Sequence, residues 1–172
     1  MSFEIMEARD YCGNPFQTMR RGVLLTAETA GRVNAMAVGW GGFGAFWGRD
    51  VVFMAVRPER FTFELMEAAE TFSVHVMPEG QAFDQIIDYC GSRSGRDEDK
   101  IAACGLTLAY EGGTPYFLEA QEVFLCRKLA RPQLLPKDFL PGNRILEDWY
   151  GGGFHHLYMG EITRILIRKQ YE

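Results

Sequence analysis

Two arginines and a threonine stand together in the segment Arg57-Pro58-Glu59-Arg60-Phe61-Thr62, which we predict to join a strand to a helix. A helix N-terminus carries free N–H donors and partial positive charge, so it attracts anions. Guanidinium groups suit phosphate oxygens, and the Thr62 hydroxyl adds a further donor. The other interpretation is that Arg57 and Arg60 are surface arginines paired with nearby glutamates, and spacing alone favours it.

A second candidate anion site is the stretch Cys90-Gly91-Ser92-Arg93-Ser94-Gly95-Arg96-Asp97-Glu98-Asp99-Lys100. Small residues and two arginines directly before a predicted helix suit a phosphate group. The stretch also carries three acidic residues, so a solvated loop that ends in a helix cap is a strong competing interpretation.

The adjacent histidines His155 and His156 begin a predicted strand. Neighbouring strand residues point to opposite faces, so the two rings do not readily share one metal ion. A histidine in such a place is more often structural than catalytic. We find no pattern typical of a metal site, of a Ser-His-Asp hydrolase or of a nucleotide-binding Walker loop.

The segment from Gly39 to Gly48 is rich in both glycine and aromatic residues. Glycines let a backbone approach a ligand closely, and the aromatic rings could stack on that ligand or form a lid. A glycine-rich turn whose aromatic side chains plug the end of a barrel is equally compatible with the pattern.

The elements that must position these residues are mainly strands. Short apolar runs separated by turn residues predict strands at Gly22–Thr26, Asn34–Gly39, Val51–Val56, Phe72–Met77, Leu106–Tyr110, Tyr116–Ala120, Val123–Ala130 and His156–Ile167. Predicted helices begin at Pro58, cover Phe83–Tyr89, and run from a cap at Asp97 to Cys104, before Gly105. Strands and helices do not alternate regularly and no G-x-G-x-x-G occurs, so a Rossmann sheet is disfavoured. We predict a mainly β protein, an antiparallel barrel with a few short helices.

Composition narrows the class of function. The chain has 172 residues with a net charge of -5, which fits one domain over residues 1–172 and gives no basic surface for nucleic acid. No apolar run is long enough to cross a bilayer, and the N-terminus lacks a signal pattern, so we expect a cytoplasmic protein without membrane contact. The four cysteines form no C-x-x-C pair and are expected to be free thiols.

Taken in order, these motifs resemble the flavin reductase-like, FMN-binding split-barrel family, and within it flavoredoxin-type proteins. The resemblance rests on Asn34–Gly41, Val56–Thr62, Gly91–Lys100 and His155–Ile162 and covers the chain from about Asn14 to Ile167. It implies a split β-barrel of Greek-key type that forms a homodimer with one FMN per subunit near the interface. FAD as an exchangeable flavin, NAD(P)H as electron donor and a redox partner protein are further expectations.

The resemblance also implies roles for individual residues. The run Asn34, Ala35, Met36 and Ala37 would lie along the flavin ring and ribityl chain, with Trp40 beside the ring. The phosphate would be held by residues of the two arginine-containing segments: Arg57, Pro58, Arg60, Thr62, Ser92, Arg93, Ser94 and Lys100. His155 matches a family histidine near the nicotinamide side of the flavin and is the candidate catalytic residue, whereas Glu161 is expected to be structural.

One segment departs from the family pattern. Residues 131–153 are longer and less regular than the short connection of two-component flavin reductases. We interpret them as a loop that crosses a partner subunit or covers the flavin, which leaves access of NAD(P)H to the ring open. The sequence is therefore compatible with an NAD(P)H-dependent flavin oxidoreductase that reduces free flavin, iron or a protein. It is also compatible with an electron carrier without NAD(P)H activity, or with a flavin- or haem-binding module without redox turnover.

Overall fold

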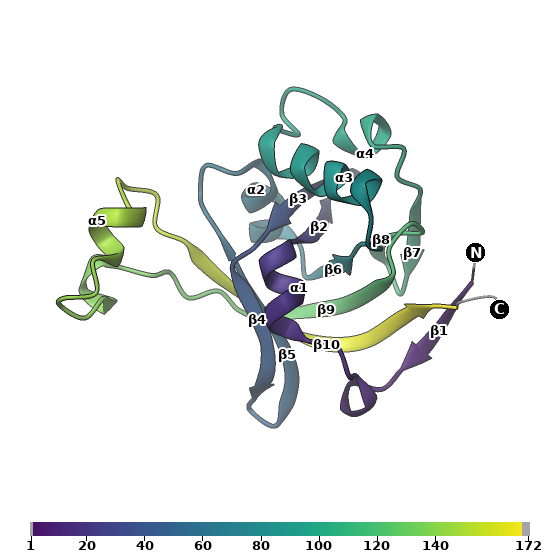
Figure 1. The fold of residues 1–172 in the computed structure, drawn as a ribbon, viewed down its shortest axis with the longest axis horizontal. Coiled ribbons are helices and arrows are strands. Elements are labelled where there is room, and N and C mark those ends of the chain that lie inside the picture. The colour runs from purple at the N-terminus through teal and green to yellow at the C-terminus, as the bar shows by residue number, and fades with distance from the viewer. Residues whose placement is uncertain (1, 170–172) are drawn as a thin grey trace.

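The computed structural model describes residues 2–169, and residues 1 and 170–172 of the expected domain lie outside this range. Figure 1 shows a strongly curved antiparallel sheet that wraps around a core, with helices at its rim. Its strands follow the order β3-β2-β6-β9-β10-β5-β4, and β1 pairs with β10. Their bounds are β1 Phe3–Met6, β2 Val23–Thr29, β3 Arg32–Val38, β4 Gly41–Phe46, β5 Arg49–Val56, β6 Thr71–Val76, β9 Glu122–Ala130 and β10 His156–Arg168.

Smaller elements surround this sheet. A separate hairpin is formed by β7 (Leu108–Glu111) and β8 (Thr114–Phe117). The helices are α1 Pro15–Arg21, α2 Phe61–Ala68, α3 Gln81–Ser92, α4 Lys100–Ala103 and α5 Ile145–Trp149, with short 3-10 turns at Ala8–Asp10 and Pro136–Asp138. The prediction of a mainly β, antiparallel fold with a few short helices is thus confirmed.

The barrel is open between its two edge strands. Within residues 2–169, β3 and β4 stand at opposite ends of the strand order and do not pair with each other. Each edge strand therefore has backbone N–H and C=O groups on one side that no neighbouring strand binds. The exposed edge of β3 is the frame on which the candidate site is built.

Two apolar clusters hold the sheet. One fills the barrel interior with side chains such as Leu25, Met54, Phe72 and Tyr158. The other lies between the outer face of the sheet, α3 and the β7–β8 hairpin, and it includes Leu24. Alternate residues of β2 enter different clusters, as the period-2 geometry of strands requires, and in β6 the buried polar residues Ser73 and His75 alternate with core residues. Both faces of these strands are consequently buried, and the site must form at the strand ends and at the β3 edge.

Two predicted helix starts are wrong. Pro58 is not the first residue of a helix, because Arg57–Arg60 form a turn that is closed by a hydrogen bond from Arg60 N to Arg57 O, and α2 begins at Phe61. Proline suits the second position of such a turn as well as the first position of a helix, because both positions require a φ near the value that the proline ring fixes. Asp97 does not cap α4: the Asp99 carboxylate accepts from the N–H groups of Ile101 and Ala102.

The glycine-rich segment is mainly a strand. Residues Gly41–Phe46 form β4, and a Cβ at Gly41 would lie 2.3 Å from the Phe53 carbonyl oxygen on the adjacent strand. Glycine is therefore needed there for the close approach of β4 to β5, not for a ligand. Trp47 and Gly48 form the hairpin turn with φ values of 53° and 68°, the pattern of a type I′ turn.

The pair Gly160-Glu161 has a structural explanation in β10. A Cβ at Gly160 would lie 2.4 Å from the Phe72 ring, so glycine leaves room for that core side chain. The Glu161 carboxylate accepts hydrogen bonds from Arg49 and Arg127 on the two neighbouring strands, which lower its pKa. Glu161 thus ties three strands together.

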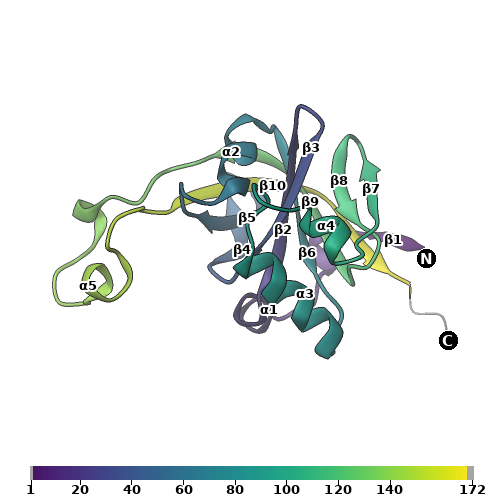
Figure 2. The same cartoon turned by 90° about the horizontal axis from the view of Figure 1, so that it is seen from above.

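Residues 131–155 form an arm that leaves the barrel. Figures 1 and 2 both show the segment around α5 extending away from the sheet, joined to it through the start of β10. Large apolar side chains of the arm, such as Leu140 and Trp149, are exposed. Only the returning end of the arm, near Trp149 and His155, reaches the candidate site.

Candidate functional site

Two adjoining pockets form a groove along the edge of β3. The first, here called the loop pocket, lies between β3, the start of α2 and the loop after α3; it is lined by Asn34, Met36, Arg60, Thr62, Ser92, Arg93, Ser94, Gly95 and Lys100, among others. The second, the tryptophan pocket, is lined by residues that include Met36, Ala37, Gly39, Trp40, Arg57, Arg60, Trp149 and His155. Its volume of about 540 Å³ is in the range usual for small-molecule sites. Met36, Glu59 and Arg60 line both pockets, so the groove is continuous.

A buried hydrogen bond fixes the floor of the loop pocket. Asn34 Nδ2 donates to Thr62 Oγ1 over 2.7 Å, and both side chains are buried. A Cβ at Gly95 would lie 2.1 Å from Asn34 Oδ1, so the loop backbone packs directly against this amide. The bond joins β3 to α2, and the packing of Gly95 against Asn34 joins the loop after α3 to both.

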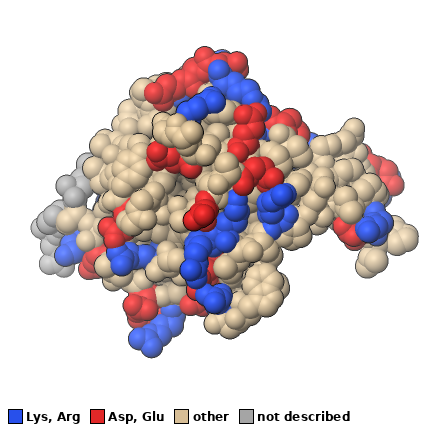
Figure 3. Space-filling view, turned by 180° about the vertical axis from the view of Figure 1, so that it is seen from behind, with Lys and Arg blue, Asp and Glu red and all other residues tan. Residues whose placement is uncertain are grey.

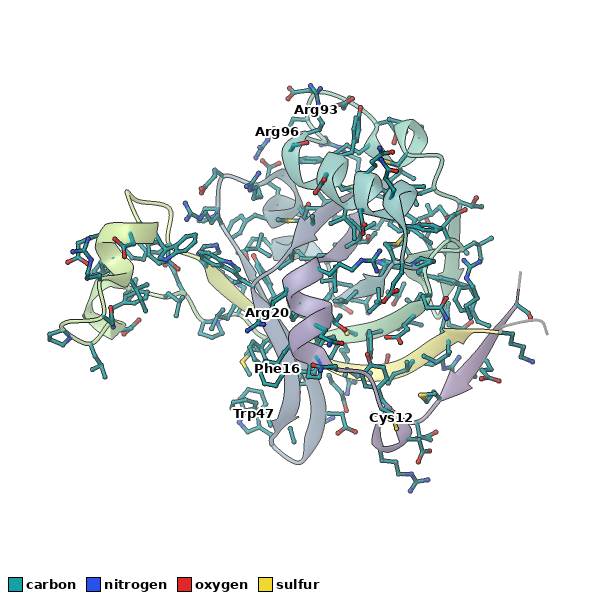
Figure 4. All side chains as sticks on the ribbon, in the orientation of Figure 1. Cys12, Phe16, Arg20, Trp47, Arg93 and Arg96 are labelled. Atoms are coloured by element: carbon teal, nitrogen blue, oxygen red, sulfur yellow. The ribbon has the colours of Figure 1, made fainter. Side chains whose placement is uncertain are left out.

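Arg60 is the cation at the junction of the two pockets. Its exposed side chain makes no hydrogen bond or ion pair with any other residue in the described range 2–169. The neighbouring arginines are engaged: Arg96 donates to Glu64 and to the Glu59 carbonyl, and Arg93 lies 4.0 Å from Glu98. Figure 4 shows Arg93 and Arg96 at the loop above α3. Arg60 is thus the guanidinium most available to an anion in the groove.

Lys100 places a second positive charge beneath the loop. The side chain is buried, and Nζ donates to the carbonyl oxygens of Cys90 and Arg93, at 2.9 and 3.1 Å. Burial lowers the pKa of this ammonium. An ammonium group has three N–H donors, so one remains for a ligand in the pocket that Lys100 lines.

Arg57 and His155 form the far wall of the tryptophan pocket. Arg57 Nε donates to His155 Nε2 over 3.4 Å, and Arg57 Nη2 donates to the Trp149 carbonyl. With Nε2 as acceptor, the neutral ring carries its proton on Nδ1 and donates to Tyr150 Oη at 2.9 Å. Burial, and then the nearby Arg57 charge, lower the pKa of His155 to about 4. The ring is therefore neutral near pH 7.

Aromatic side chains line the same pocket. The Trp40 ring lies 4.8 Å from the His155 ring and 5.0 Å from Trp149, measured between centroids. Trp40 and Trp149 remain partly exposed. A flat ligand could stack against such a surface.

The structure brings most of the predicted site residues into one groove but divides them between its two pockets. Of these two pockets, Arg57 and His155 line the tryptophan pocket alone, whereas Thr62, Lys100 and the loop residues line the loop pocket alone. Two predicted residues line neither: Ala35 packs into the core on the outer face of the sheet, and Pro58 lies in the turn before α2. Their predicted direct contact with a flavin receives no support from the pockets.

Sequence reasoning missed several lining residues. Glu59 and Phe61 lay inside the arginine segment but were not singled out, although they flank Arg60. Trp149 lies far along the chain from Trp40, and its only signal was an aromatic residue in the irregular segment 131–153. Gly95 could have been recognised only from its packing against Asn34.

The surface and the side-chain groups give no sign of other chemistry in the described part of the chain. Figure 3 shows Lys and Arg interspersed with Asp and Glu on the face opposite to that of Figure 1, without one broad basic area. Residues 2–169 contain no cluster of three or more His, Cys, Asp or Glu side chains that could hold a metal ion. Over the same residues, none of the helices has the length and apolar character that a membrane crossing requires.

Solved structures with this architecture include flavin-binding proteins. Flavoredoxin from Methanosarcina acetivorans superposes with a TM-score of 0.68 at 21% identity, covering 98% of this chain and 78% of that chain. The FMN-binding domain of a flavin reductases-like enzyme from Shewanella baltica superposes with a TM-score of 0.64 at 19% identity. This match covers 97% of this chain and 78% of that chain. A split-barrel protein from Shewanella frigidimarina superposes with a TM-score of 0.66 at 17% identity, covering 87% of this chain and 67% of that chain. At these identities the likeness establishes the fold, a split barrel.

No curated protein matches the sequence significantly. The model of the flavin reductase like domain, by contrast, matches residues 17–172, which is nearly the whole chain and includes every residue of the groove described above. The protein therefore belongs to the flavin reductase-like family.

Proposed function

We propose that the groove binds FMN, with the phosphate in the loop pocket and the ring in the tryptophan pocket, and that residues 1–172 act as one flavin-binding domain. The observation that carries this proposal is the unpartnered Arg60 guanidinium at the junction of the two pockets. The spare N–H donor of Lys100 and the Ser92–Ser94 loop would complete the phosphate site.

The residues of the groove fit this cofactor chemically. A phosphate dianion needs cations and N–H or O–H donors, which the loop pocket offers. A flat ring needs apolar walls and a polar edge, which Trp40 and the free backbone edge of β3 offer. FMN, when bound, supplies the transfer of hydride and single electrons. The protein would hold it, shield it and place charge near it.

We further propose that electrons pass from NAD(P)H through the flavin to free flavin, iron or a protein acceptor. Arg57 would place positive charge at the ring end of the groove. His155 remains the candidate residue on the nicotinamide side. Because both of its ring nitrogens already have partners, we assign it the role of a flat, neutral wall rather than a proton donor.

The second candidate function is an electron carrier without NAD(P)H activity. It is favoured by one observation: Trp149 and the end of the arm stand over the tryptophan pocket, where a nicotinamide ring would have to enter. Rapid mixing of the flavin-loaded protein with NADH or NADPH separates the two. Fast loss of flavin absorbance with either nucleotide supports the oxidoreductase, whereas loss only with a partner reductase supports the carrier.

A homodimer is part of the proposal. Phe16, Trp47 and Leu140 expose 64–77% of their surface, so apolar area is left that a second copy could cover. Figure 4 labels Phe16 in the first turn of α1 and Trp47 at the β4–β5 hairpin. Light scattering coupled to size-exclusion chromatography measures the mass of the assembly. A mass of 19.5 kDa, that of one chain, would contradict the homodimer.

Flavin binding is tested by calorimetric titration of FMN and riboflavin. Arg60→Ala should weaken FMN by about tenfold and leave riboflavin unchanged, because only FMN carries the phosphate. Arg20→Ala is the matched control, since Arg20 is an exposed arginine on α1 that lines no described pocket. Failure of the wild-type protein to bind FMN would refute the proposal.

A further inference from the structure

Two of the four cysteines lie together beside the loop pocket. Cys90 is buried in the last turn of α3, and Cys104 is half-buried directly after α4. Cys90 belongs to the apolar cluster on the outer face of the sheet, Cys104 packs against that cluster, and a hydrogen bond joins the two thiols. Figures 1 and 2 both show α3 and α4 next to each other at this rim of the barrel. The structure therefore places two thiols in contact at one edge of the loop pocket.

The other two cysteines lie elsewhere and are not part of this pair. Cys126 is fully buried in the barrel interior, where its thiol donates to the Phe124 carbonyl. Cys12 is exposed near the N-terminus, and its thiol donates to the Asp10 carbonyl. Cys12 therefore serves as a reference for an exposed thiol, and Cys126 as a reference for an inaccessible one.

Cys90 and Cys104 mark the two ends of the loop that follows α3. Residues 91–103 lie between them and include the loop residues that line the loop pocket. The thiol form of the protein holds this loop through Lys100, whose Nζ donates to the carbonyl oxygens of Cys90 and Arg93. A covalent bond between the two sulfur atoms would close the same loop and remove open conformations from its ensemble.

The surroundings make Cys104 the first of the two thiols to react. Burial raises the pKa of Cys90 to about 12. Burial also raises the pKa of Cys104, with a smaller contribution from Glu98, but the hydrogen bond from Cys90 and the Lys100 charge oppose this rise. Cys104 is also the more exposed of the two. A reagent in solution thus meets Cys104, and Cys90 stands in contact with it for a second step.

We propose that Cys90 and Cys104 form a redox-active pair, which a small-molecule disulfide converts reversibly into one intramolecular disulfide bond that locks the loop. The Cys104 thiolate attacks one sulfur of the small disulfide, whose S–S bond breaks and releases one thiolate. Cys90 then loses its proton to water and attacks the Cys104 sulfur, which expels the second small thiolate. The two protein thiols are oxidised, the small disulfide is reduced to two thiols, and these take up the two protons. The inference does not depend on which ligand the groove binds.

Oxidised glutathione is the probe for this reaction. The experiment uses the Cys12→Ser variant, because the exposed Cys12 thiol could otherwise link two chains. After oxidation and alkylation of the remaining thiols, digestion with trypsin and chymotrypsin separates Cys90 from Cys104 at Arg93 and Cys104 from Cys126 at Tyr110. Mass spectrometry should find one linked peptide pair that carries Cys90 and Cys104. Dithiothreitol should abolish this pair, and alkylation should find Cys126 unmodified by glutathione.

Limited trypsin digestion of the folded protein measures the lock on the loop. Arg93 and Arg96 are exposed between the two cysteines, and cleavage there requires local opening of the loop. Oxidation should slow cleavage at these two arginines by about tenfold. Cleavage at Arg144, which lies at the start of α5 in the arm, should not change. In a variant that also carries Cys104→Ser, oxidised glutathione should leave all these rates unchanged.

Three results would overturn the proposal. One is the absence of a linked peptide pair in oxidised protein whose thiols are all recovered by alkylation after unfolding. Another is accumulation of Cys104 as a mixed disulfide with glutathione, which would show that Cys90 does not attack it. The third is a Cys90–Cys104 bond that leaves cleavage at Arg93 and Arg96 as fast as before. Because the first two readouts come from a chain with both thiols intact, they hold even if Cys90→Ser or Cys104→Ser fails to fold.

Discussion

Arg57 Nε donates a hydrogen bond to His155 Nε2, and the Arg57 charge is one of the reasons that the His155 pKa falls to about 4. Burial is the larger cause. We therefore predict that Arg57→Gln raises the pKa of His155 but leaves it below the ordinary value near 6.5, since burial persists. Titration of the histidine ring protons by NMR measures this shift.

Arg131→Gln is the matched control for that titration. Arg131 contributes to the lowered pKa of His156, on the opposite face of β10, and not to that of His155. Of these two histidines, His156 alone should show a raised pKa in Arg131→Gln. An unchanged His155 pKa in Arg57→Gln would contradict the proposed electrostatic contact.

A second prediction concerns Gly95. A Cβ there would meet Asn34 Oδ1 at 2.1 Å and the Phe61 ring at 2.9 Å. Because Asn34 is buried and hydrogen-bonded to Thr62, it cannot move away freely. Gly95→Ala should lower the free energy of unfolding by about 1–3 kcal/mol and weaken FMN binding, as measured by urea denaturation and calorimetry. Gly151→Ala, where nothing lies within 4 Å, should match the wild type in both measurements.

The arginine segment shows what the sequence could and could not predict. The residue types predict an anion-binding corner, and the pattern also predicts a helix that begins at Pro58. In the structure the chain turns between Arg57 and Arg60, so one guanidinium lies against His155 and the other between the pockets. Turn and helix both accept proline with the same φ, and only the tertiary fold distinguishes them.

The strands were predicted where apolar residues alternate or run together. The strand β4 was not predicted, because glycine has low strand propensity and because the pairing of β4 depends on the neighbouring β5. The contact of Trp40 with Trp149 joins segments more than one hundred residues apart, and no local pattern records it. Asp97 and Asp99 are equally good caps by type, so backbone geometry alone decides between them.

Acid sensitivity is a third prediction, and it follows from His75. The ring is fully buried, with Nδ1 donating to the Leu24 carbonyl and Nε2 accepting from Phe117 N–H. Burial lowers its pKa to about 4, so the unfolded chain, with a pKa near 6.5, binds the proton more readily. Stability is therefore greatest above pH 6.5 and falls as the pH drops toward 4. Between pH 7 and pH 5 the loss from His75 should be about 2 kcal/mol.

Urea denaturation at pH 7, 6 and 5 measures this loss. His155 acts in the same direction, because its pKa is also lowered to about 4. His75→Gln should therefore be less stable than wild type at pH 7 yet lose less stability on acidification. A variant with the same pH slope as the wild type would show that His75 is not the group that titrates.

The last prediction concerns a buried hydroxyl without a partner. Thr26 in β2 is fully buried, and its Oγ1 makes no hydrogen bond to any residue in the described range 2–169. Thr26→Val keeps the shape of the side chain and removes the unpaired polar atom. We expect the free energy of unfolding to stay the same or to rise by up to about 1 kcal/mol in urea denaturation. Thr62→Val is the matched comparison, because it breaks the bond to Asn34 and should cost about 1–2 kcal/mol. Equal destabilisation by both substitutions would mean that the Thr26 hydroxyl is satisfied in solution, for example by a buried water.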